Sequence, residues 1–334
     1  MGLAICGVVF YHAPFVIHNP WLKLLHDMLY CGVDMFLFLS GLGACHSIRS
    51  RGGWGYLRQR ALRLLPGLYL ILIPWCLIMF LMGLMSGLAV LGSITLIGWW
   101  FGQMNQLNWY FSAVWLFFLL AVPLYRLFSR VKHPVLLWLC LTVLSFPLCL
   151  FCPADRFLVI VTRLPVFFTG ILFGCLEQRG FSKQWLLRAI AYPLALVGLW
   201  LVPVTFWGIG WTYGNSLGLW WYPFALLIPG GAIMVADLAA LLRKSRFLSM
   251  LMRPVEWCGE ASGEILMIHM AIYKIFLATV SLRNRYWACI LLGCLVLGCL
   301  YRRFVTSRIS LPAWLTNCPN PVPVIFAHFR RKRY

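Results

Sequence analysis

The chain has 334 residues, of which 62% are hydrophobic and 11% are charged, whereas a soluble domain carries about 25% charged residues. This composition excludes an ordinary soluble domain and indicates a membrane protein. The 28 Lys and Arg residues outnumber 8 Asp and Glu residues, which gives a net charge of +20. In a soluble chain this balance would point to nucleic acid, but cytoplasmic loops of membrane proteins also collect basic residues. We therefore expect no nucleic-acid partner, and we expect the basic residues to face anionic membrane lipids.

Apolar runs long enough to cross a bilayer, about 20 residues each, recur along almost the whole chain. Backbone polar groups in lipid must be hydrogen-bonded within their own segment, which favours helices. We predict an all-α fold, a polytopic transmembrane helix bundle of about ten spans. The predicted spans lie near residues 2–17, 28–47, 64–82, 107–127, 134–151, 158–177, 187–206, 218–241, 256–279 and 287–305.

The stretch 88–101 is apolar but has only 14 residues, so we interpret it as a short interfacial or re-entrant piece.

The charge distribution predicts the orientation of these spans. With a cytoplasmic N-terminus, 22 of the 28 basic residues fall on the inner side, as the positive-inside rule requires. Both termini are then cytoplasmic. We predict a multi-pass protein of the cell (plasma) membrane, with one transmembrane domain over residues 1–308 and a basic cytoplasmic tail over 309–334.

Ionisable groups inside spans are costly and are therefore functional candidates. For any single histidine, the alternative is a structural hydrogen bond to a neighbouring helix. In the ninth span, Glu256, Glu260 and Glu264 are spaced to share one helix face, and His269 lies about 140° around from Glu264. Two polar faces predict a helix inside the bundle. The candidates within spans are His12, Asp34, Arg163, Glu264 and His269.

Three arginines lie at the predicted cytoplasmic mouth of the third span. Arg60 and Arg63 are three residues apart, and Arg58 precedes them. An ordinary positive-inside loop would explain them, but guanidinium groups at this spacing also suit bidentate binding of phosphates. A cytoplasmic phosphorylated cosubstrate is one interpretation. Cys149 and Cys152 form a lone C-x-x-C pair without a second pair or a nearby histidine, so no metal site is predicted.

Six segments of this chain resemble those of acyltransferase family 3, the membrane acyltransferases that modify bacterial surface sugars. The resemblance runs from residue 2 to about residue 275, and the segments occur in the family's order and spacing. They read GLAICGVVFYH, GVDMFLFLSG, YLRQRALRLLP, LNWYFSAVWL, RLPVFFTGILFG and GEASGEILMIH.

The resemblance implies that His12 is the catalytic residue, because it matches the family's first-span histidine. The family has an arginine eleven positions earlier, where this chain has Met1. A late start, a truncated sequence, or a member lacking the arginine would each explain this. A late or truncated start is our expectation, because the motif resumes at Gly2.

The resemblance also assigns residues to the donor and to the second histidine. It implies that the arginine pair at 60 and 63 holds an anionic acyl donor, and it aligns Arg163 with the arginine of an R-x-P-x-F segment. Ser262, Glu264 and His269 match S-x-E-x-x-x-x-H. Leu37 and Leu266 depart from the family's usual Phe and Tyr, both at apolar positions. The candidate donor-binding residues are Arg58, Arg60, Arg63, Arg163 and Ser40.

The reaction implied is transfer of an acyl group, expected to be acetyl, from acyl-CoA to a hydroxyl of a cell-surface or exported glycan. Neutral imidazole is suited to accept the hydroxyl proton near pH 7. Asp34 or Glu264 is expected to orient a histidine. Direct transfer and an acyl intermediate on His12 or Ser40 are both open. A separate protein is a possible partner that completes the route.

Two other functions are compatible with the sequence. A transporter or flippase would also be polytopic and would use buried His and Glu residues as proton relays. Transporters commonly contain internal repeats, and none is found here. A member retaining only a binding role is the other alternative.

Overall fold

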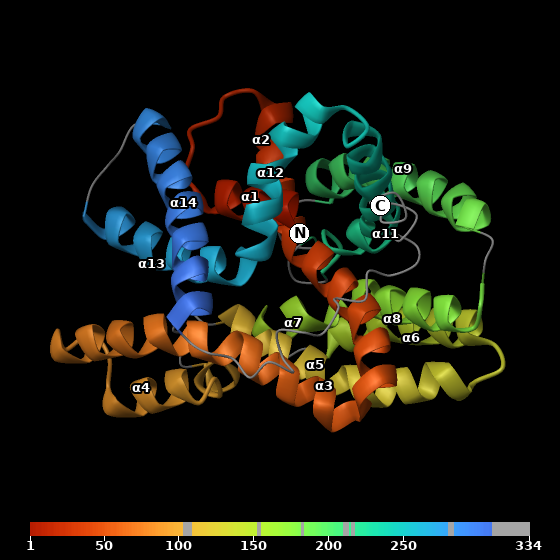
Figure 1. The fold of residues 1–334 in the computed structure, drawn as a ribbon, viewed down its shortest axis with the longest axis horizontal. Coiled ribbons are helices and arrows are strands. Elements are labelled where there is room, and N and C mark those ends of the chain that lie inside the picture. Colours follow the sequence, from red (N-terminus) through yellow and green to blue (C-terminus); the bar gives the residue numbers. More distant parts are fainter. Residues whose placement is uncertain are drawn as a thin grey trace. The chain divides into compact units, whose positions relative to one another are not determined.

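The computed structural model describes residues 1–102, 109–151, 155–181, 184–209, 214, 218–279 and 284–308. Over these residues every regular element is a helix (Figure 1), which confirms the predicted all-α class. The described chain divides into two compact units, each assembled from separate stretches of sequence. The predicted domain over 1–308 stays a prediction, and the predicted tail over 309–334 lies outside the described residues.

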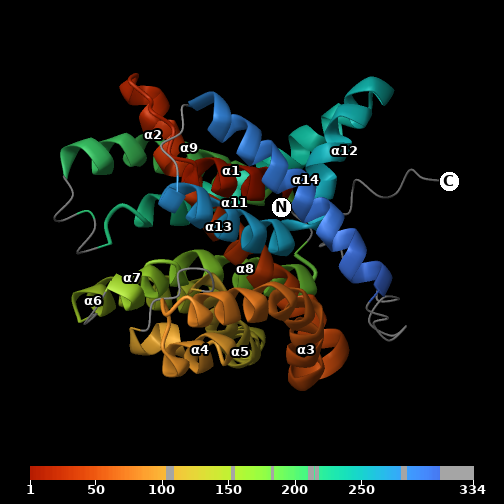
Figure 2. The same ribbon diagram turned by 90° about the vertical axis from the view of Figure 1, so that its left-hand side faces the viewer.

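The first unit contains Met1–Val33, Leu57–Leu116 and the described part of Arg253–Cys318. Its helix α1 packs against α13, and α13 lies beside α14 (Figures 1 and 2). The approach is close, because a Cβ atom on Gly298 would lie 2.3 Å from the Ile265 side chain. Its elements are α1 (Gly2–His12), α2 (Pro20–Met28), η1 (Leu29–Cys31), the later part of α3 (Gly32–Leu81), α4 (Gly87–Ile94), η2 (Gly98–Phe101), the first part of α5 (Trp109–Arg130), most of α12 (Arg246–Glu260), α13 (Ser262–Thr279) and α14 (Asn284–Arg308).

The second unit contains Asp34–Tyr56 and Phe117–Met252. Here α9 and α11 run side by side, and α8 packs on α6 and α11. The earlier part of α3 crosses α8 through small residues, as helices in membranes commonly do. A Cβ atom on Gly170 would lie 2.2 Å from the backbone oxygen of Phe38. Besides its parts of α3, α5 and α12, this unit contains α6 (Pro134–Leu150), α7 (Asp155–Val161), α8 (Leu164–Gln178), α9 (Gln184–Gly208) and α11 (Tyr222–Leu242).

Six helical stretches among the described residues are long and apolar enough to cross a membrane. They overlap seven predicted spans, because the first stretch holds two, separated at Gly52, whose φ of 72° breaks α3. Two shorter apolar helices, Gly2–His12 and Pro134–Cys149, coincide with two more predicted spans. The ten-span count and the cytoplasmic termini stay predictions. The six stretches are Pro20–Leu81, Trp109–Arg130, Arg156–Gln178, Trp185–Gly208, Tyr222–Leu242 and Tyr286–Ser307.

Three predicted spans differ from the observed helices. The first ends at His12 rather than residue 17, because Ala13 precedes Pro14 and adopts an extended conformation. The span predicted over 158–177 is divided into α7 and α8 just before Pro165, which has no N–H to donate to the preceding turn. The span predicted over 256–279 is interrupted at Ala261. The expectation that three glutamates share one face of a single helix is therefore wrong.

Candidate active site

The structure brings His12 and His269 together in the first unit. His12 is the last residue of α1, and His269 lies in the middle of α13. His269 Nε2 is 3.4 Å from His12 Nδ1, and the ring centroids are 5.1 Å apart. His269 is fully buried, whereas His12 is half-buried. His12 is therefore the more exposed of the two rings.

The packing of α1 on α13 produces this pair. Near its start, α1 also packs on α12, where a Cβ atom on Gly2 would overlap the backbone oxygen of Val255, so only glycine permits this approach. Nearer the end, the Tyr273 hydroxyl donates a hydrogen bond of 3.2 Å to the carbonyl oxygen of Val9. Contact with α12 near its start and with α13 near its end thus holds α1 beside His269.

Backbone carbonyls determine which ring nitrogens carry hydrogen. Nδ1 of His12 lies 2.8 Å from the Val8 oxygen, and Nδ1 of His269 lies 2.9 Å from the Ile265 oxygen. A carbonyl only accepts, so each Nδ1 carries the proton and each neutral ring has its lone pair on Nε2. His269 Nε2 lies 3.4 Å from His12 Nδ1, whose single hydrogen is donated over the shorter distance to the Val8 oxygen. The lone pair on His12 Nε2 is the one that can accept a proton from a substrate.

His26, which the sequence interpretation passed over, holds the end of α1. It lies in α2 and is 7% exposed. Its Nε2 is 3.1 Å from the Phe10 oxygen and 3.2 Å from the Ala13 oxygen, and its Nδ1 is 3.0 Å from Asp27 Oδ1. Donation to the last carbonyls of a helix satisfies acceptors that have no partner within the helix. His26 therefore stabilises the turn that carries His12.

Glu264 belongs to a cluster of charges rather than to the histidine pair. Its Oε1 accepts a hydrogen bond of 2.9 Å from Arg302 Nη1. Arg63 interacts electrostatically with Arg60, Arg302 and Glu264. The arginine pair expected to bind the donor thus lies with a third arginine from α14. Arg58, two residues before Arg60, is exposed on α3.

Asp34 and Arg163 form a buried ion pair in the second unit. Arg163 Nε lies 3.4 Å from Asp34 Oδ1, and the two side chains are 7% and 1% exposed. The close crossing of α3 and α8 at Gly170 brings Asp34 to the residue that precedes α8. The Arg163 guanidinium also donates to the Val159 oxygen and lies over Trp221. Ser40 lies half-buried further along α3.

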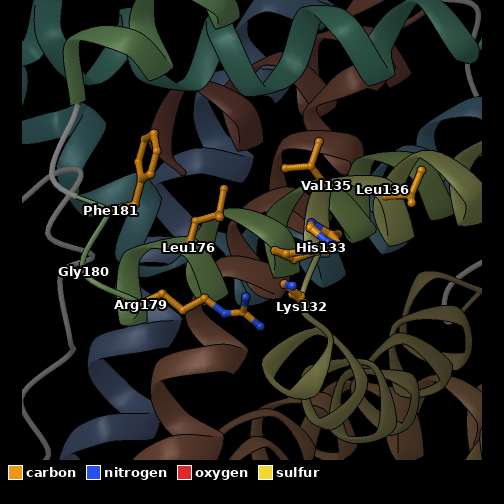
Figure 3. Close-up of a pocket in the computed structure, with 9 residues that line it drawn as sticks. Lys132, His133, Val135, Leu136, Leu176, Arg179, Gly180 and Phe181 are labelled. Atoms are coloured by element: carbon orange, nitrogen blue, oxygen red, sulfur yellow. The ribbon is translucent and has the colours of Figure 1, made fainter.

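A pocket of about 800 Å³ opens in the second unit between the end of α8 and the start of α6. The guanidinium of Arg179 extends toward Lys132 and His133 (Figure 3), while Leu136 and Phe181 supply apolar walls. Arg179 Nη2 donates to three carbonyls at the end of α5. None of the predicted site residues lines this pocket.

Of the two cysteines in the C-x-x-C pair, the structure describes only Cys149. Cys149 lies 3.1 Å from the Tyr222 hydroxyl, and Cys152 lies outside the described residues. Within the described ranges, no cluster of three His, Cys, Asp or Glu side chains is placed to hold a metal ion.

The apolar helices long enough to cross a membrane indicate a multi-pass membrane protein, and its first unit contains the histidine pair and the arginine cluster. The model of the family described as an acyltransferase domain matches residues 2–303. The chain therefore belongs to acyltransferase family 3, as its sequence motifs indicate. No curated protein and no solved structure matched this chain. The roles of the individual site residues stay predictions.

Proposed function

We propose that this membrane acyltransferase moves an acetyl group from acetyl-CoA, supplied from the cytoplasm, to a hydroxyl of a cell-surface or exported glycan at the plasma membrane. The geometry of the histidine pair carries the proposal, because the Val8 carbonyl accepts the Nδ1–H of His12 and leaves the lone pair on Nε2, and because His12 is half-buried whereas His269 is fully buried. Family membership supports acyl transfer as the reaction class.

The proposed step is direct transfer. His12 Nε2 takes the proton of the acceptor hydroxyl while the hydroxyl oxygen attacks the thioester carbonyl carbon. The carbon–sulfur bond then breaks, and the CoA sulfur leaves with the proton returned by His12. His269 holds the His12 ring in place, and it acts as a positioning residue because it is fully buried.

The phosphates of the donor are proposed to bind the arginine cluster of the first unit. An arginine guanidinium can bind two phosphate oxygens at once. Arg60 and Arg63 are close enough to interact electrostatically, so both can attract the same phosphate groups. Glu264 precedes His269 by five residues on α13, a rise of about 7.5 Å at 1.5 Å per residue. A donor with its phosphates at the arginines can therefore extend its flexible arm toward the histidines. Arg163, paired with Asp34, is retained as a further candidate for donor binding.

The test is transfer of labelled acetyl from acetyl-CoA to membrane glycans by the purified protein in nanodiscs. We expect His12→Ala to lower the rate by about 10²–10⁴-fold, the usual contribution of a general base. His18→Ala is the matched control, because His18 is an exposed histidine six residues away, and it should retain the parental rate. Parental transfer by His12→Ala would overturn the assignment.

A further inference from the structure

Three segments of the first unit meet around Gly67. The Tyr301 hydroxyl of α14 donates a hydrogen bond of 3.0 Å to the Gly67 carbonyl of α3. A Cβ atom on Gly67 would lie 3.9 Å from Glu264 Oε1 of α13. Arg302, the residue after Tyr301, reaches this carboxylate with its guanidinium, and the Arg302 side chain is 24% exposed in contrast to 8% for that of Glu264. Glu264 therefore anchors a partly accessible arginine beside α3.

The cluster has more positive charge than Glu264 can neutralise. Arg63 interacts electrostatically with Arg60, Arg302 and Glu264, so these four side chains carry an excess of two positive charges. Close like charges repel, and the repulsion is larger near a low-dielectric membrane interior than in water. A ligand with more than one negative charge would reduce this repulsion among the arginines. Phosphate groups fit best, because each guanidinium presents a planar fork of donors.

We propose that Arg302 is a third arginine for the donor's phosphates, joining Arg60 and Arg63, and that Glu264 orients its guanidinium. The inference rests on the proposed function, because it takes the donor to be a CoA thioester. It adds a residue 239 positions beyond Arg63 in the sequence, and it gives Glu264 a positioning role toward the donor.

The next residue provides a matched control. Arg303 has the same charge and the same depth along α14, but its guanidinium lies over the Trp257 ring, 5.6 Å from the centroid, and its side chain is exposed. Any effect that arises only from removing positive charge at this end of α14 should therefore be shared by Arg302→Gln and Arg303→Gln.

The experiment measures CoA binding to the full chain in phosphatidylcholine nanodiscs by isothermal titration calorimetry. We expect Arg302→Gln to weaken binding by roughly tenfold or more, the size expected for losing hydrogen bonds between charged groups. Arg303→Gln should stay within about twofold of the parent, because that side chain points elsewhere. Arg302→Lys should fall between them, since an ammonium keeps the charge but loses the fork. Pantetheine, which lacks the phosphates, is the second probe, and its affinity should not change in Arg302→Gln.

The outcomes separate this inference from the proposed function. If the parent binds CoA and the two variants Arg302→Gln and Arg303→Gln have the same CoA affinity, the inference is overturned and the proposed donor stands. If the parent binds no CoA, the proposed donor itself fails. Equal losses for CoA and pantetheine would show a general defect of the variant and overturn the phosphate contact. In nanodiscs that also contain phosphatidylglycerol, an Arg302→Gln variant that loses phosphatidylglycerol binding but keeps parental CoA binding would also overturn the inference, because the occupant would then be a lipid head group.

Discussion

The candidate site residues were easier to predict than their partners. His12 and His269 are ionisable groups in apolar segments, and that cost alone marks them as candidates. Their contact joins residues 257 positions apart, and it depends on the packing of α1 on α13, which the sequence does not determine. Arg302 was counted only among inner basic residues, because arginines at the end of a span satisfy the positive-inside rule without any further role. His26 was missed because it falls between two predicted spans.

The buried pair of Asp34 and Arg163 leads to a prediction on stability. Removing one partner of a buried ion pair leaves an uncompensated charge and costs about 3–5 kcal/mol. Asp34→Ala should therefore lower the unfolding temperature in detergent markedly. The double variant Asp34→Ala, Arg163→Met removes both charges and should recover part of the loss.

An exposed ion pair of the same kind is the control for this prediction. Lys23 and Asp27 have side chains 51% and 30% exposed, and surface pairs contribute about 0–1 kcal/mol. Lys23→Ala should therefore change the unfolding temperature little. If Asp34→Ala unfolds at the parental temperature, or if the double variant is less stable than the single one, the pair does not stabilise the fold in this way.

At the scale of elements, some helix ends were predictable and others were not. Pro14 disfavours a helical Ala13 and so marks the end of α1, but the apolar residues 15–17 extend the hydropathy pattern beyond it. Pro165 lies in the first turn of α8, where the missing N–H of proline is tolerated, and so marks the start of that helix. The interruption at Ala261 has no proline. Gly259, two residues before the break, packs against the backbone of Gly2 in α1. A contact with another helix therefore lies beside this interruption.

The crossing of α3 and α8 gives a prediction with an internal control. A Cβ atom on Gly170 would lie 2.2 Å from a backbone oxygen, whereas one on Gly231 of α11 would meet no atom within 4 Å. Gly170→Ala should lower stability by about 1–3 kcal/mol through overpacking. Gly231→Ala should be neutral or stabilising, because alanine is the better helix former by up to about 1 kcal/mol. Thermal unfolding in detergent compares them, and a Gly170→Ala variant as stable as Gly231→Ala would contradict this packing.

For the whole molecule, composition predicted the helical membrane class, and the order of six motifs predicted the family. Neither predicted the division into two compact units, because each unit collects segments far apart in the sequence. Hydropathy detects a segment that suits lipid, but it does not say which segments pack together. The placement of the histidine pair and the arginine cluster in the same unit therefore came only from the structure.

The central claim is that His12 and His269 act as one unit in which His12 is the base. The most direct measurement is the single-turnover rate of acetyl transfer by His12→Gln, His269→Gln and the double variant, at saturating acetyl-CoA. The account predicts a loss of about 10²–10⁴ for His12→Gln, a smaller loss for His269→Gln, and a double variant no slower than His12→Gln, because residues that act as a unit are non-additive. A His269→Gln variant slower than His12→Gln, or losses that multiply in the double variant, would contradict the account.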